Sequence, residues 1–311
     1  MRSPAWLTVI FCVAFLSGFA QHKTQNIDSI RNRSVQRFQD YFFCWPVIKQ
    51  RSTSFEFRTD RSGQTIKFRP NNSVQLGLGF YLFEIGFEVT FDVPQIKRNN
   101  YLFGESDAKD LQANILGKNW GADLFISDYQ GFYKDDSANP KGANQPYPQR
   151  PDIRTHNVGI NGIYIFRQNK FSLRSAYNFA ERQKKSGGSI SLAGTFNSYR
   201  VSADSTVLSK KNDAIFDRFI DFNRLLNTTF SVAPGYTYNV IVKNFFLNTS
   251  LGFGPSVNWI NYSFVGGQPL SQTSLSTFLD YRMAIGYNGD RFFCGVSFLI
   301  FLRERKTIDC K

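Results

Sequence analysis

The sequence is poor in the residues that build catalytic and metal centres. Its 311 residues include two histidines and four cysteines, and they form no CxxC or HExxH motif and no loop with calcium-ligand spacing. His22 falls in a polar segment, and His156 has the parity of Val158 and Ile160, so we read it as a surface histidine near a strand end. We therefore expect no enzyme activity, catalytic residue, metal ligand or cofactor.

Long apolar runs are also missing. After the first twenty residues, no stretch approaches the roughly 18 apolar residues of a membrane-spanning helix. Residues 1–20 carry one cation, Arg2, then a short apolar core and small residues before Ala20, which predicts a cleaved signal peptide. If the mature chain meets a membrane, we expect it to do so as strands.

The charge is unbalanced towards basic residues, with a formal net charge of +13. For a secreted chain this favours lipid phosphates or other anionic envelope material over nucleic acid. Three cysteines follow the signal segment: Cys44, Cys294 and Cys310. In an oxidising compartment, either Cys44 and Cys310 form a bridge or the three stay free or partly paired.

What the sequence has in abundance is alternation with a period of two, which predicts strands. Bulky residues such as Ile190, Leu192 and Phe196 alternate with Ser, Ala, Thr and Asn. An unbroken parity from Ile66 to Phe80 predicts one long strand with an irregularity at Pro70. Twelve strands follow from this pattern, at residues 54–57, 66–80, 85–91, 110–117, 120–129, 154–166, 170–180, 188–200, 227–242, 245–262, 274–287 and 291–302.

Two architectures produce such alternation. A soluble sandwich or lipocalin-like barrel turns the apolar face inward, whereas a membrane barrel turns it towards lipid. The polar face here consists mainly of Gly, Ser, Asn and Thr, several segments reach 13 residues or more, and the chain has 33 Phe and 14 Tyr. These features favour an all-β, transmembrane, antiparallel up-and-down β-barrel of about 12 strands.

This interpretation divides the chain into a signal peptide (1–20), a periplasmic N-terminal lead-in with one helix (21–50), an outer-membrane barrel (51–303) and a basic tail (304–311). It places the loops 92–109, 130–153 and 181–187 outside. It also puts the long connection 201–226 on the inner side and the short turns 243–244 and 288–290 outside. Either that region is unusual or the strand count is off by one.

Charged residues on the polar parity are the candidate site. They either pair across the lumen and plug it or line a constriction that selects by charge. Bulky residues such as Tyr81 and Phe278 on the same parity favour a narrow or plugged lumen. The candidates are Lys67, Arg69, Glu84, Glu88, Arg174, Asp280 and Arg282.

Several segments also carry a resemblance to a known family. They are FRPNNSVQLGLGFYL (68–82), GADLFISDYQGFY (121–133), FSLRSAYNFAERQKKSGGSI (171–190) and SVAPGYTYNVIVKNFFLNTSLGFGP (231–255). Together they resemble an uncharacterised, Bacteroidetes-type family of domain-of-unknown-function proteins. The resemblance implies an outer-membrane β-barrel and supplies no functional residues.

We therefore expect a non-enzymatic protein of the bacterial outer membrane, either a narrow porin-like channel or a structural envelope component. Its expected partners are outer-membrane lipid and lipopolysaccharide, the barrel-assembly machinery, and a small solute or ion that remains unidentified. Arg182, Lys184 and Lys185 are candidates for lipopolysaccharide phosphates, with a solvated charged turn as the alternative. Two other classes remain open: a soluble periplasmic or secreted ligand-binding β-barrel, and an outer-membrane lipid hydrolase or acyltransferase.

Overall fold

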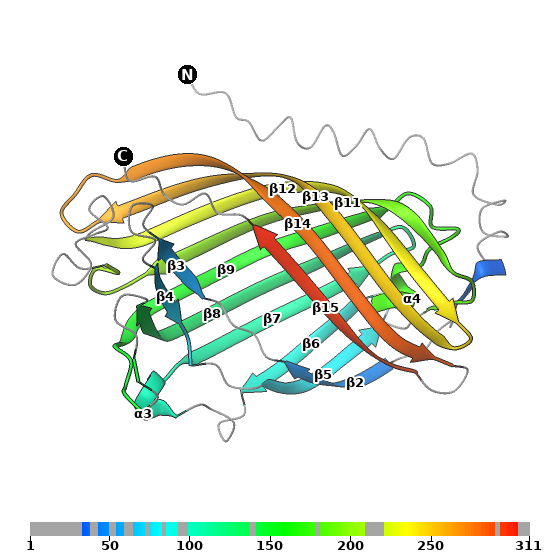
Figure 1. Cartoon of the computed structure of the whole chain (residues 1–311), viewed down its shortest axis with the longest axis horizontal. Coiled ribbons are helices and arrows are strands. Elements are labelled where there is room, and N and C mark those ends of the chain that lie inside the picture. The colour runs from blue at the N-terminus through cyan, green and yellow to red at the C-terminus, as the bar shows by residue number, and fades with distance from the viewer. Residues whose placement is uncertain are drawn as a thin grey trace.

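A single curled antiparallel sheet dominates the computed structural model (Figure 1). The structure describes residues 33–37, 43–49, 54–58, 65–71, 75–82, 85–92, 99–136, 141–142, 144–177, 181–208, 221–289 and 293–303. The predicted signal peptide, Glu84, Cys310 and the basic tail lie outside these residues.

The sheet has thirteen strands, eleven of them on one hydrogen-bonded path. Along that path neighbours are antiparallel, which confirms the predicted all-β antiparallel class. In spatial order the path contains β15 (Phe293–Arg303), β14 (Leu270–Asn288), β13 (Phe245–Phe264), β12 (Phe222–Val242), β11 (Gly187–Ser202), β9 (Gln149–Ile165), β8 (Trp120–Asp136), β7 (Asp107–Leu116), β6 (Ile85–Asp92), β5 (Gln75–Leu82) and β2 (Phe43–Lys49).

Four short strands and two short helices complete the described fold. The hairpin of β3 (Phe55–Arg58) and β4 (Thr65–Arg69) joins the sheet where β4 pairs with the end of β8. A separate two-stranded sheet pairs β1 (Val35–Arg37) with β10 (Glu181–Gln183). The helices are α3 (Asn100–Phe103) and α4 (Leu173–Tyr177).

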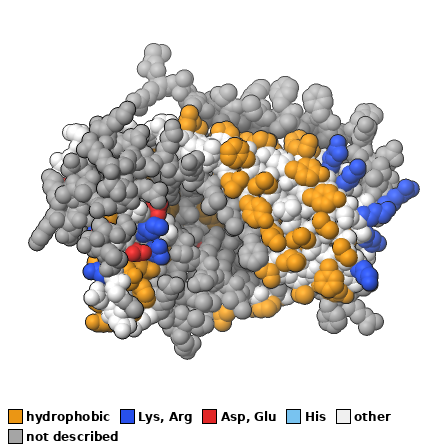
Figure 2. Space-filling model, in the orientation of Figure 1, with side chains coloured by type: hydrophobic (Ala, Val, Ile, Leu, Met, Phe, Trp, Pro, Cys, Tyr) orange, Lys and Arg blue, Asp and Glu red, His pale blue; other side chains and the backbone are white. Residues whose placement is uncertain are grey.

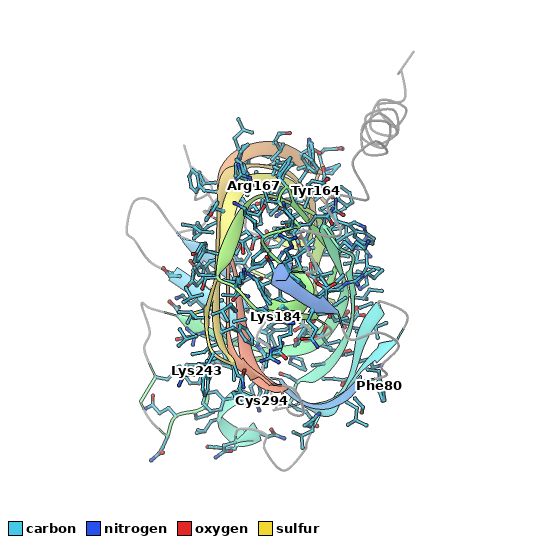
Figure 3. The ribbon with its side chains drawn as sticks, turned by 90° about the vertical axis from the view of Figure 1, so that its right-hand side faces the viewer. Phe80, Tyr164, Arg167, Lys184, Lys243 and Cys294 are labelled. Carbon is cyan, nitrogen blue, oxygen red and sulfur yellow. The ribbon has the colours of Figure 1, made fainter. Side chains whose placement is uncertain are left out.

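The path ends at β15 on one side and β2 on the other. Because eleven antiparallel strands alternate in direction, these two edge strands run the same way. Among the described residues no ladder joins them. The sheet nevertheless curls around an interior, as the end-on view in Figure 3 shows.

The segment 170–180 was predicted as a strand, but its described part, residues 170–177, forms no strand in the sheet, so this prediction was wrong. They contain α4, in which Leu173, Arg174, Ser175 and Ala176 are all buried, and β9 pairs directly with β11. Both the apolar and the polar side chains of this segment are covered. Phe171 and Leu173 pack on inward residues of β9, and the polar side chains form hydrogen bonds within the interior. The sequence of this segment therefore alternates as a strand does, although its described residues form no strand of the sheet.

Removing that one crossing reverses the side of every later loop, so the strand count was indeed off by one. The tight turn at Lys243–Asn244 now lies at the same end as the tight turn before Trp120. The connection between β11 and β12 begins and ends at the other end of the sheet, as does the connection between β8 and β9. The segment around Lys184, expected outside, lies instead at the end with the short turns (Figure 3).

A second prediction, of one strand through residues 66–80, was also wrong. Ile66 and Phe68 belong to β4 and are buried, whereas Leu76 and Leu78 belong to β5 and are exposed. The parity continues through the break by coincidence. In addition, β2 lies inside the segment predicted as a lead-in. The pattern missed this strand because FCWPVIK shows no alternation of apolar and polar residues.

The two faces of the long strands have opposite chemistry, as the alternation indicated. Bulky side chains point outward: Leu192 is 40% and Phe253 60% exposed. Their neighbours Ser191 and Ser250 point inward and are 3% and 4% exposed. Figure 2 shows the outward apolar side chains as a broad belt over the long strands.

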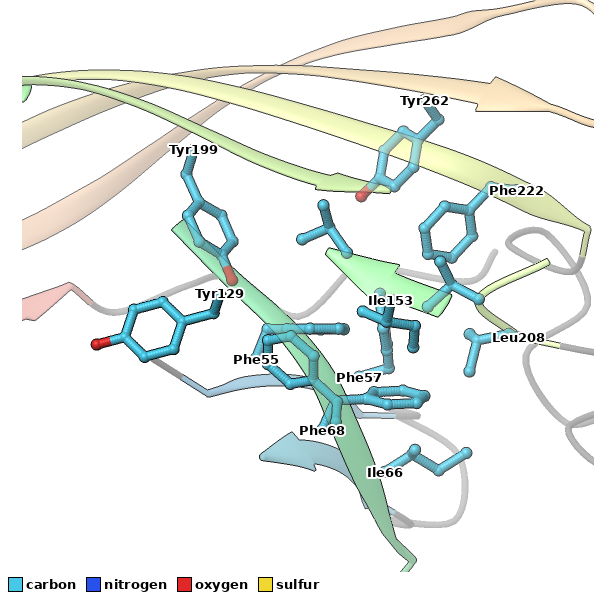
Figure 4. Close-up of a cluster of buried hydrophobic side chains, with 13 residues drawn as sticks. Phe55, Phe57, Ile66, Phe68, Tyr129, Ile153, Tyr199, Leu208, Phe222 and Tyr262 are labelled. Carbon is cyan, nitrogen blue, oxygen red and sulfur yellow. The ribbon is translucent and has the colours of Figure 1, made fainter. Parts of the chain in front are cut away.

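One end of the interior is filled by an aromatic cluster (Figure 4). The β3–β4 hairpin supplies Phe55, Phe57 and Phe68, and Phe57 meets Phe222 of β12 with ring centroids 5.5 Å apart. Beside this cluster, Arg150 donates to the carbonyl oxygens of Thr206 (2.8 Å) and Val207 (3.1 Å). These contacts hold the connection after β11 against the cluster.

Candidate functional site

The candidate site is the interior at the opposite end, where polar groups gather around the α4 segment, residues 166–177 and 181–186. This segment leaves β9 and returns to β11, and its middle lies inside the sheet, since residues from Phe171 to Ala176 are buried. Inward side chains from β8, β12, β13 and β14 surround it. We call this set of hydrogen bonds and ion pairs the interior network.

Arg282 of β14 is the centre of one half of the network. Its Nε donates to Asp280 Oδ1 over 3.0 Å, and its Nη1 lies 3.5 Å from Asp123 Oδ2 on β8. Asp123 also accepts a hydrogen bond from Asn114 Nδ2 on β7. All three charged residues are at least nine-tenths buried. A buried guanidinium with two carboxylates compensates charges that would be costly alone.

Arg174 and Glu181, both within the α4 segment, form the other half. Arg174 Nε donates to the Leu116 carbonyl oxygen over 2.7 Å, and its Nη1 lies 3.7 Å from Glu181 Oε1. The same carboxylate accepts a hydrogen bond from Ser172 Oγ over 2.6 Å. The segment thereby brings its own counter-charge into the interior, and one bond ties it to the end of β7.

Several hydrogen bonds attach the α4 segment to the wall formed by β12, β13 and β14, and three of them involve interior side chains of the wall. The Tyr177 hydroxyl donates to Asn248 Oδ1 over 2.7 Å, Asn239 Nδ2 donates to Gln183 Oε1 over 3.2 Å, and Asn288 Nδ2 donates to the Glu181 carbonyl over 3.1 Å. Burial raises the pKa of the Tyr177 phenol, so the hydroxyl remains a neutral donor. The wall and the segment thus fit each other group by group.

The structure brings together only part of the charged set predicted from sequence. Asp280, Arg282 and Arg174 lie in the interior network, Arg174 from α4 and not from a strand. Lys67 and Arg69 are about 40% exposed on β4 and pair with carboxylates of Glu56 (3.3 Å) and Asp135 (3.4 Å). Figure 2 shows charged side chains gathered there, over β3 and β4.

The remaining two candidates are not placed. Glu84 lies outside the described residues, and the structure describes the backbone of Glu88 in β6 but not its side chain. Sequence reasoning missed Asp123, Glu181 and Asn248. For Asp123 a signal existed, because it alternates with the outward residues Leu124 and Ile126. Glu181 had none, since its segment was assigned to an outer loop.

Other candidate chemistry lies away from the network. His156 Nδ1 contacts Asp128 Oδ1 at 2.5 Å on the outward face, and both side chains are about half exposed. No group of three His, Cys, Asp or Glu residues that could hold a metal ion occurs among the described residues. Cys44 and Cys294 are free and exposed.

Within the part of the chain that the structure describes, no helix is long and apolar enough to cross a membrane.

The family model for a domain of unknown function, DUF4421, matches residues 32–308, which is nearly the whole chain. The chain belongs to the DUF4421 family. The predicted resemblance to a domain-of-unknown-function family is therefore confirmed in that respect. Comparisons with curated proteins and with solved structures gave no match. For this DUF4421 protein the interior network and the outward belt remain the basis for any functional argument.

Proposed function

We propose that this DUF4421 protein is a β-barrel of the bacterial outer membrane, without enzyme activity, whose occluded interior makes it a structural component of the envelope. The observation that carries the proposal is the reversal of the usual distribution of side chains. Apolar side chains cover the outside of the long strands, while Ser, Thr, Asn and paired charges fill the inside. Water as the only solvent would favour the opposite arrangement.

The extent of the outward belt supports a bilayer as its environment. Large apolar side chains are exposed along β8, β9, β11, β12 and β13, whereas soluble monomers rarely expose apolar patches larger than a few hundred Å². Outward apolar positions run from Val158 on β9 to Phe166, the residue directly after β9, and from Phe245 to Trp259 on β13. At about 3.3 Å per residue and a tilt of about 40°, these spans are about 20 and 35 Å tall, either side of the roughly 25 Å lipid-facing band.

Occlusion follows from what fills the two ends of the interior. The aromatic cluster with the β3–β4 hairpin occupies the end with the long loops. The α4 segment occupies the end with the short turns, and its side chains bond to the wall. An interior closed twice favours the structural role over a permanently open pore.

A gated conduit is the second candidate, and one observation favours it. The α4 segment is held by side-chain hydrogen bonds and by a three-residue ladder between β10 and β1. Its described residues form no ladder with the main sheet, so it is able to leave without breaking the ladders of the wall. Displacing it would expose Asp123, Asp280 and Arg282 to a passing ion.

Three measurements test the proposal. Membrane fractions should retain the protein until detergent is added, and unboiled samples should migrate differently on a gel from boiled ones. Release into the soluble fraction without detergent would overturn the membrane assignment and favour a soluble ligand-binding barrel. In planar bilayers, the structural role predicts no conductance, whereas stepwise currents would favour the conduit.

A further inference from the structure

The two ends of the described molecule differ in charge. At the end with the short turns, exposed or half-exposed cations project from the turns and from the α4 segment, and on the face that Figure 2 shows, the charged side chains coloured at that end are basic. Among these cations are Lys118, Arg167, Lys170, Lys184, Lys185 and Lys243. Arg182 is also half-exposed there and donates a hydrogen bond to Asn244 Oδ1. In the described turns of that end the one carboxylate is Glu181, which is buried beside Arg174.

The other end carries both signs in pairs. Lys67 pairs with Glu56 and Arg69 with Asp135. Arg150 pairs with its neighbour Asp152 at 2.8 Å. The excess positive charge of the described molecule is thus concentrated at the end with the short turns. A face of this kind attracts anions.

Aromatic side chains form a collar directly beside these cations. Trp120 is 45%, Tyr164 43%, Phe166 57% and Phe245 61% exposed on the outward face. Trp120 and Tyr164 are partners across β8 and β9, and Phe245 packs edge-to-face on Tyr287 with ring centroids 5.2 Å apart. Exposed aromatic residues at the limit of an apolar belt are typical of the membrane–water interface.

Three of the cations belong to the collar by position. Lys118 lies two residues before Trp120, Arg167 directly follows Phe166, and Lys243 lies two residues before Phe245. In the end-on view, Arg167 and Lys243 lie towards the rim, whereas Lys184 lies nearer the middle of the end face (Figure 3). Rim cations beside a collar are at the level of lipid headgroups, and a cation in the middle faces water.

We propose that Lys118, Arg167 and Lys243 form a binding surface for the phosphate groups of anionic phospholipids in the leaflet at the short-turn end. The collar contacts the acyl chains close to the headgroup, and the three cations contact the phosphates. This inference rests on the proposed membrane location and adds to it the lipid class that the rim selects. A soluble polyanion, attracted by the whole end face, is the competing partner.

The expected selectivity follows from the charge of each cation. A cation near an anionic membrane surface favours association by about fivefold. Phosphatidylglycerol carries a net negative charge and phosphatidylcholine none, so the rim should retain the former over the latter. The preference should be lost when the rim charges are removed.

The chain offers a matched control for the experiment. The rim variant K118Q/R167Q/K243Q and the control variant K170Q/K184Q/K185Q each remove three positive charges from the same end. The control changes only the α4 segment. Each protein is folded in detergent containing equal amounts of phosphatidylglycerol and phosphatidylcholine. Native mass spectrometry then gives the ratio of the two lipids retained, and gel mobility before boiling confirms folding.

The expected result is enrichment of phosphatidylglycerol by at least about fivefold for the wild type and for the control, and a ratio near one for the rim variant. An unselective wild type would overturn the inference. Equal loss in both triple variants would also overturn it, because the attraction would then belong to the end face as a whole and favour a soluble polyanion. Release of the wild type from membrane fractions without detergent would instead refute the proposed membrane function.

Discussion

Phe253 offers the sharpest separation between a lipid-facing and a water-facing belt. It lies on the outward face of β13, 60% exposed, near the middle of the apolar stretch from Phe245 to Trp259. In a bilayer, Phe253→Lys places an ammonium group near the midplane and should reduce the free energy of folding into the membrane by about 2–4 kcal/mol. In water, the same change at so exposed a position should stay within about 0.5 kcal/mol.

Phe245 is the matched control for this prediction. It is also a phenylalanine, lies on the same face of the same strand and is 61% exposed, but it sits beside the turn. Eight residues separate it from Phe253, about 27 Å along the strand. Because the cost of a lysine falls to about 0–1 kcal/mol at the interface, Phe245→Lys should be tolerated.

The assay is reversible urea unfolding in lipid vesicles, followed by gel mobility before boiling. The two variants have the same change of side chain, so their difference in unfolding free energy reports depth in the bilayer. A difference of about 2 kcal/mol or more supports a lipid-facing belt. Equal and small effects of both variants would refute the reasoning, because the two sites would then not differ in depth within a bilayer.

Three further predictions concern the interior and the wall. Arg282→Met should destabilise the protein by about 3–5 kcal/mol, since it leaves two buried carboxylates uncompensated; a neutral effect in urea unfolding would speak against a dry interior. Gly254→Ala should reduce the free energy of unfolding by about 1–3 kcal/mol or more, because the new Cβ would lie 2.0 Å from the Val232 carbonyl oxygen. Gly194→Ala should have a small effect, because its Cβ would lie 3.5 Å from the nearest atom, the Ser231 carbonyl oxygen. Equal unfolding midpoints of the two variants would contradict this difference. Replacing residues 168–184 with a Gly-Ser linker of equal length should let a water-soluble thiol reagent reach a cysteine placed at Asn248, the partner of Tyr177, and continued protection would show that the segment does not seal its end of the interior.

The part of the fold that the sequence predicts well is the part written in local alternation. Ile190, Leu192 and Phe196 point outward, and the Ser and Thr residues between them point inward, because side chains in a strand alternate whatever the sheet does elsewhere. The antiparallel class followed from the same pattern, whereas the family came from the resemblance of whole segments.

Alternation fails where both parities are covered. Ser172 and Arg174 look like one face of a strand and Phe171 and Leu173 like the other, yet all four are buried inside the sheet. A local sequence pattern does not distinguish a strand whose two faces have different surroundings from a segment whose two faces are both covered by protein. That single error displaced the later loops and hid Glu181, whose partners lie in β14 and α4.

The charged set was predicted in part for a related reason. Parity selected Asp280 and Arg282 correctly as inward residues of β14. It failed for Lys67 and Arg69 because the chain breaks after β4, so their strand belongs to a hairpin whose aromatic face is the buried one. Pairing of Arg282 with Asp123 depends on strands that are distant in sequence, and such contacts carry no local signal.

Site-directed spin labels on β13 test the central claim most directly. Labels at Leu251 and Phe253 should be relaxed by oxygen dissolved in the bilayer and protected from a water-soluble reagent, whereas labels at Ser250 and Gly252 should be reached poorly by both. Free access of the water-soluble reagent to Leu251 and Phe253 would contradict the account, because the outward belt would then face water.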